Sequence, residues 1–150
     1  MKNRSGWIIV GAVVVCAAVG AAWAAKKELT AMAPDDLKWN EIPETGGVQV
    51  APVSGDMTKG KHTVFVKMPA AQVHPLHTHT SELKTVVISG TFAVGPEGGP
   101  EKKLGPGSYI VIPGGMKHTS SCEKGCVLFQ EGAGKFDMKP VGEKPAAKKE

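Results

Sequence analysis

Three histidines, His77, His79 and His118, are the residues of this sequence best suited to bind a metal ion. His77 and His79 are one residue apart, so in an extended strand their side chains point to the same face. His118 follows the turn residues of the segment IPGGMKH, which favours its arrival from a different strand. Three imidazoles on one face leave coordination positions open on a divalent ion, as catalytic and ligand-binding sites require. The spacing therefore predicts a three-histidine metal site.

The residues around these histidines form two longer motifs. The first reads HTHTSELKTVVISG and the second GSYIVIPGGMKH. Together they resemble the paired motifs of the cupin superfamily, and the chain is most similar to small, single-domain, exported bacterial cupins of the RmlC-like and ChrR-like kind. The resemblance implies an all-β fold, a single cupin barrel (jelly roll, double-stranded β-helix), with His77, His79 and His118 as ligands. A shared fold does not define the reaction, so the chemistry must be argued from the site.

The sequence departs from the cupin pattern in two places. The family's glutamate ligand would stand where this chain has Leu83, and Glu82 lies one position earlier. A one-residue slip turns a strand side chain to the opposite face, so Glu82 reaches the ion only if the segment TSE is still loop. Glu82 is therefore a fourth candidate ligand, with both outcomes open. Cys122 occupies a position that is usually asparagine in the family.

The ligand set predicts a divalent metal ion: Fe, Mn, Ni, Zn or Cu. With Glu82 the site favours manganese, iron or nickel, and without it three neutral imidazoles suit zinc, iron or copper equally. One functional hypothesis is an exported metal-dependent oxidoreductase, dioxygenase-like, acting on a small molecule. The alternative is a non-catalytic metal- or ligand-binding or sensing module. The resemblance to three-histidine thiol dioxygenases is weakened because those enzymes hold a carboxylate with arginine, which the chain lacks after Arg4.

Two further residues are candidates to support the ligands or to face a substrate. His74 is expected in a loop at the barrel mouth, with a surface position as the alternative. Tyr109, by alternation from Gly107, is expected to face the barrel, either as a proton donor or as a core tyrosine with a satisfied hydroxyl. His62, which begins an expected strand, is predicted to be exposed.

Cys122 and Cys126 flank the short segment EKG, which suits a hairpin turn with a bulge. Facing positions across such a turn approach disulfide distance, and export favours oxidation. We therefore expect a disulfide between them, with a redox-active pair or sulfur ligands for a soft metal as alternatives.

The N-terminus has the pattern of a signal peptide. Lys2 and Arg4 precede an apolar run over residues 7–19, and AWA at residues 22–24 is a cleavage pattern of small residues. We expect a signal peptide at 1–24 and a periplasmic or secreted chain. An uncleaved membrane anchor remains the alternative, because the apolar stretch approaches a spanning length.

The remainder has room for one domain. We expect an N-terminal arm at 25–46, the cupin β-barrel at 47–142 and a disordered tail at 143–150, which is charged and has no large apolar residue to bury. Short apolar or alternating runs between turn residues predict strands at 48–52, 62–68, 83–94, 109–112, 127–131 and 136–141.

Charge limits the classes of partner. Loss of Lys2 and Arg4 lowers the formal net charge from +4 to about +2. Arginine is the residue that reads guanine edges and grips phosphate bidentately, and every remaining cation is lysine. We therefore expect no nucleic acid partner, but a small-molecule ligand or substrate, with a homodimer left open.

Overall fold

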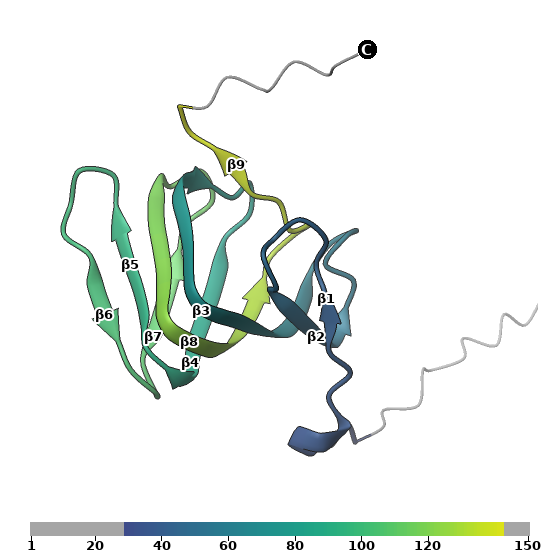
Figure 1. Ribbon diagram of the computed structural model, residues 1–150. Coiled ribbons are helices and arrows are strands. Elements are labelled where there is room, and N and C mark those ends of the chain that lie inside the picture. The colour runs from purple at the N-terminus through teal and green to yellow at the C-terminus, as the bar shows by residue number, and fades with distance from the viewer. Residues whose placement is uncertain (1–28, 143–150) are drawn as a thin grey trace, which may run out of the picture. The chain divides into compact units, whose positions relative to one another are not determined.

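The computed structural model describes residues 29–142, so the expected signal peptide and the expected tail lie outside the described residues. Within this range the strands dominate, which confirms the all-β class (Figure 1). No helix of residues 29–142 is long and apolar enough to cross a membrane. In chain order the elements are the 3-10 helix η1 (Pro34–Asp36) and the strands β1 (Asn40–Glu41), β2 (Gln49–Gly55), β3 (His62–Thr78), β4 (Leu83–Gly90), β5 (Phe92–Pro96), β6 (Lys102–Leu104), β7 (Tyr109–Ile112), β8 (His118–Gly132) and β9 (Lys139–Pro140).

Two long strands, β3 and β8, pair antiparallel along most of their length and are shared by two groups of strands. The first half of β3 and the second half of β8 pair with β2 and β4 respectively. The other halves pair with β9 and β5. Both strands have a left-handed residue near the middle, Ala71 with φ of 59° and Gly125 with φ of 82°. Such residues accompany bulges, which bend a strand and let it pass from one sheet to the other.

The pairing order runs β1-β2-β3-β8-β4-β7, with β6 and β9 attached through β5 and β3. The first and last strands of this order, β1 and β7, do not pair with each other, so the strands do not form the closed barrel that we expected from the sequence. The core lies between the strand groups. Its fully or nearly buried members include Val64, Val87 and Leu128. Along β3, His62, Val64 and Val66 are buried while the residues between them are less so, because alternate side chains of a strand point to opposite faces.

Two expectations for local structure are wrong. The segment around Cys122 and Cys126 is not a hairpin turn but the bend of β8, which continues through it. The expected strand 83–94 is interrupted at Gly90, whose φ is 76° and where a Cβ would lie 2.2 Å from the Gly125 carbonyl oxygen. That close approach of two backbones requires a glycine. The segment between the motifs also contains β6, which pairs with β5 and was not expected.

Candidate metal centre

The structure brings the three histidines of the two motifs together. His77 lies near the end of β3, His79 follows directly after it, and His118 begins β8 opposite His77 in the strand register. One ring nitrogen of each histidine lies within 4.8 Å of the corresponding atoms of the other two. The three residues are 3%, 5% and 2% exposed. They form a buried cluster with the donor atoms that a transition metal needs.

The hydrogen bonds of the cluster determine which nitrogens can bind an ion. Nδ1 of His77 donates to the Pro75 carbonyl oxygen at 2.7 Å, and Nδ1 of His118 donates to the Met116 carbonyl oxygen at 3.0 Å. Nδ1 of His79 donates to the carbonyl oxygen of Asp137. A carbonyl oxygen only accepts, so each neutral ring must carry its proton on Nδ1, which leaves the Nε2 lone pair free. Metal-binding histidines are oriented by donating in this way.

Burial favours the neutral form of His77 and His79. Desolvation first, together with the proximity of His118 and His79, lowers the pKa of His77 from 6.5 to about 4, although the hydrogen bond to Pro75 opposes this shift. Desolvation is also the main cause that lowers the pKa of His79, against its bond to Asp137. Only a neutral imidazole can donate a lone pair to an ion. His77 and His79 can therefore bind a cation near neutral pH without first releasing protons.

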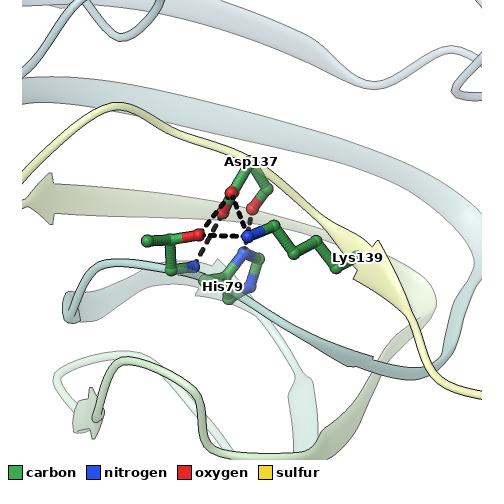
Figure 2. A network of polar contacts seen from close by, with 4 residues as sticks. His79, Asp137 and Lys139 are labelled. Carbon is green, nitrogen blue, oxygen red and sulfur yellow. Dashed lines mark hydrogen bonds and ion pairs between the residues drawn. The ribbon is translucent and has the colours of Figure 1, made fainter.

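Asp137 anchors the segment that orients His79 (Figure 2). Its carboxylate accepts hydrogen bonds from the Thr80 backbone N–H at 2.7 Å and from the Thr80 hydroxyl at 2.5 Å. Lys139 lies 3.3 Å from the same carboxylate and donates to the Thr80 hydroxyl oxygen at 2.6 Å. These bonds, the hydrogen bonds of Thr80 first, lower the pKa of Asp137 to about 2. The Asp137 carboxylate thus stays ionised in all but strongly acidic solution.

The segment around Asp137 also contacts the histidines through side chains. The Phe136 ring centroid is 5.3 Å from that of His79, and the Phe136 N–H donates to the Met57 carbonyl oxygen at 2.8 Å. Phe136 and Met138 line the same cavity as the histidines. Asp137 lies between them in sequence and bonds to Thr80 instead. Sequence reasoning missed Asp137, and the only available signal was the alternation of Phe136 and Met138 around it.

Glu82 does not join the cluster. Its carboxylate lies 3.7 Å from Lys84 Nζ, and its side chain is 41% exposed. The buried ligand candidates are His77, His79 and His118 alone among residues 29–142. Glu82 lies in the short connection between His79 and β4. This segment is loop, as a ligand role for Glu82 required, yet the Glu82 side chain pairs with Lys84. The donor set of the structure is therefore neutral.

Of the two supporting candidates, only His74 reaches the site. His74 is not in a loop but in β3, where it pairs with Ser120 of β8. Its Nδ1 is 3.3 Å from the Ser120 hydroxyl oxygen and its Nε2 is 3.2 Å from the Gln72 amide nitrogen. Burial lowers its pKa. Tyr109 is 60% exposed, so the expectation that it faces the barrel is wrong.

The remaining histidine and the cysteines lie away from the cluster. Cys122 and Cys126 are joined by a disulfide across the bend of β8, with a Cα–Cα distance of 5.8 Å. They therefore offer no thiolate to a metal in this state. His62 is 2% exposed, against our expectation of an exposed residue. Its Nδ1 donates to the Gly60 carbonyl oxygen at 2.9 Å, while its buried Nε2 has no partner among the described residues.

A cavity of about 150 Å³ adjoins the three histidines and extends into the core. Apolar side chains form most of its wall, among them Val48, Val66, Leu83, Phe92 and Leu128. The uncharged side chains of Thr45, Thr85, Ser120 and Gln130, together with His74, are its other polar members. Among residues 29–142 no lysine, aspartate or glutamate side chain lines it. Ligand sites are commonly concave, mostly apolar and equipped with a few polar groups, as this one is.

Comparisons with known proteins agree with this architecture. Among solved structures, an RmlC-like cupin from Shewanella frigidimarina is 18% identical, with a TM-score of 0.55 over 75% of this chain and 91% of that one. An acetylacetone dioxygenase from Acinetobacter johnsonii is 16% identical, with a TM-score of 0.62 over 81% and 84%. The polyketide cyclase RemF from Streptomyces resistomycificus is 18% identical, with a TM-score of 0.63 over 79% and 89%. At these identities the likeness shows a cupin fold and nothing more.

Sequence comparison places the chain in a family. Dimethylsulfoniopropionate lyase DddQ from Ruegeria pomeroyi is 34% identical over 55 residues, which are 37% of this chain and 27% of that protein. The match thus spans about a quarter of the relative's length. Residues 27–134 match the family described as the ChrR cupin-like domain, which covers most of the chain. This protein therefore belongs to the ChrR cupin-like family of the cupin superfamily.

Proposed function

We propose that His77, His79 and His118 bind one divalent metal ion and that the protein is a metal-dependent oxidoreductase of the dioxygenase kind, acting on a small molecule. One observation carries this proposal. Each of the three rings donates from Nδ1 to a backbone carbonyl oxygen, so all three present Nε2 as a free donor within one buried cluster. Histidines that only fill space in a core have no reason to share one tautomer and to gather their free nitrogens in one place.

The donor set favours a transition metal. Three neutral imidazoles suit zinc, iron and copper, and leave positions open for water or substrate. The placement of Glu82 beside Lys84 argues against a negatively charged set. A bound ion would supply redox chemistry if it is iron or copper, or Lewis acidity if it is zinc.

The chain's own side chains hold and shield a substrate. The mostly apolar wall of the cavity disfavours water in the region beside the histidines. His74 and Ser120, bonded to one another at 3.3 Å, are the polar pair nearest the cluster in sequence and register, and can exchange that bond for one to a substrate. Family relationships support action on small molecules, because the relatives include a lyase and the fold neighbours a dioxygenase and a cyclase.

A non-catalytic metal- or ligand-binding module is the second candidate. The observation that favours it is the lack of acid and base groups. Apart from the three candidate ligands, His74 is the only titratable side chain that lines the cavity among the described residues. A module that binds a ligand without converting it requires no such groups.

Oxygen uptake by the iron-loaded chain separates these candidates. The chain is loaded with Fe(II) under argon and mixed with a panel of small ketones, diketones, thiols and phenols while dissolved oxygen is recorded. The oxidoreductase predicts oxygen uptake in proportion to added substrate for at least one compound, and none for His118→Ala. Full iron loading without uptake for any compound, combined with saturable ligand binding, would favour the module.

We also propose that the protein is exported. The signal-like N-terminus motivates this proposal, and the disulfide between Cys122 and Cys126 supports it, because disulfides persist in oxidising compartments. The full chain should be recovered from a bacterial periplasmic fraction with its N-terminus at Ala25, as N-terminal sequencing would show. Recovery of the unprocessed chain in the membrane fraction would indicate the anchor instead.

A further inference from the structure

The cavity beside the histidines has a defined size. Its volume is about 150 Å³. An engineered protein cavity of about this volume, lined by leucine, isoleucine and phenylalanine, binds benzene. The space beside the cluster therefore fits a molecule of roughly six to eight non-hydrogen atoms.

The polar side chains beside the three candidate ligands carry no formal charge near neutral pH and are already hydrogen-bonded. The Gln130 amide donates to the Thr85 hydroxyl oxygen at 3.2 Å. His74 is held between Ser120 and Gln72. A ligand can replace one of these hydrogen bonds by one of its own, but none of these side chains offers it a formal charge. A charged group buried without a partner costs far more than a neutral one, so the cavity disfavours charge on any part of a ligand that does not touch the ion.

Two lysines that adjoin cavity-lining residues in sequence have other partners. Lys139 pairs with Asp137 and Thr80. Lys84 pairs with Glu82. Neither lysine lines the cavity. A ligand carboxylate remote from the ion would thus gain neither of these lysines without breaking its pair.

We propose that the site selects small, mainly apolar molecules that reach the ion through one oxygen donor group and carry no second charge. This inference rests on the proposed metal site, because no cationic side chain of residues 29–142 lines the cavity and an acidic donor would there depend on the ion for a positive charge. It excludes amino acids, dicarboxylates and phosphate esters as ligands. It admits short-chain ketones, diketones, phenols and monocarboxylates.

Three matched ligands test the inference on the cobalt-loaded chain. Pentanoate and 4-aminobutanoate have the same length and shape but differ in a terminal methyl or ammonium group, and succinate ends in a carboxylate. Binding is followed by the visible absorption of Co(II) and by calorimetry. We expect pentanoate to bind at least about 10-fold more tightly than either charged analogue, since an unpaired buried charge costs more than the 1.4 kcal/mol of a tenfold change.

A variant of the cavity wall provides the matched control. Gln130→Glu keeps the shape of the side chain and adds one negative charge. It should bind cobalt like the parent and shift the preference toward 4-aminobutanoate by at least about 10-fold. Gln130→Leu, which adds no charge, should leave the preference for pentanoate in place.

The outcomes separate this inference from the proposed function. If the parent binds cobalt through the histidines but holds 4-aminobutanoate or succinate as tightly as pentanoate, the inference is overturned and the metal site stands. If cobalt is not bound, or is bound equally by His118→Ala, the proposed metal site fails and the inference fails with it.

Discussion

Replacing Asp137 by alanine should weaken metal binding although Asp137 touches no ion. The carboxylate accepts two hydrogen bonds from Thr80, at 2.7 Å and 2.5 Å, and pairs with Lys139 at 3.3 Å. Without them, the backbone at residue 137 is no longer held where its carbonyl oxygen accepts the Nδ1 proton of His79. His79 then loses the partner that determines its tautomer and ring orientation.

The magnitude follows from the kind of contact that is lost. Groups that orient metal-binding histidines typically contribute 10- to 100-fold to metal affinity. Asp137 acts through its backbone carbonyl, which the variant retains, and its side chain is 30% exposed. We therefore expect the lower end, about 10-fold, which corresponds to about 1.4 kcal/mol. Competition titration of zinc against a chromophoric chelator measures this difference directly.

Asp56 provides a matched control. Its carboxylate accepts from the backbone N–H and hydroxyl of Thr58, at 2.9 Å and 2.7 Å, and pairs with Lys59 at 2.8 Å. This turn has the same kinds of bonds but orients none of the three candidate ligands. Asp56→Ala should leave zinc affinity within about 2-fold of the parent. Equal affinities for Asp137→Ala and Asp56→Ala would refute the positioning role.

Three further predictions concern stability. When the pH falls from 7.5 to 5, the free energy of unfolding of the metal-free chain should decrease by about 2 kcal/mol through His77. The pKa of His77 is about 4 in the folded chain and 6.5 in the unfolded chain, so protonation favours unfolding as the pH falls. Urea melts should show this decrease, and His77→Gln should lack it. Gly132→Ala should cost about 1–3 kcal/mol, because its Cβ would lie 2.2 Å from the buried His62 ring, and His62→Ala should restore part of this loss in the double variant; thermal melts without that rescue would contradict the clash. Replacing both Cys122 and Cys126 by alanine should cost about 2 kcal/mol, the value for closing so short a loop, and an unchanged urea midpoint would show that the bridge adds nothing.

The histidine cluster could be predicted from sequence because its cause is local. Alternation along one strand places His77 and His79 on one face, and the turn residues before His118 mark the start of another strand. What the sequence could not show is the register between distant strands. The pairing of His77 with His118, on which the cluster depends, is a property of the sheet as a whole.

The predictions that proved wrong also depended on how distant parts of the chain pack together. Cys122 and Cys126 have the spacing of a hairpin, yet β8 continues through them because β3 supplies hydrogen bonds on both sides of the bend. The expected phase of the alternation is wrong for Tyr109, because Ile110 and Ile112 are the buried residues of β7 and Tyr109 therefore lies on its exposed face. Asp137 could not be found because its partner Thr80 lies far away in the chain.

Metal analysis of the chain without residues 1–24 tests the central claim most directly. The chain from Ala25 is purified without a metal-binding tag, reconstituted and compared with a His77→Ala, His118→Ala double variant. We predict close to one iron, zinc, copper, nickel or manganese ion for each parent chain and none for the variant. If parent and variant hold equally little metal after reconstitution, the three histidines do not form a metal site.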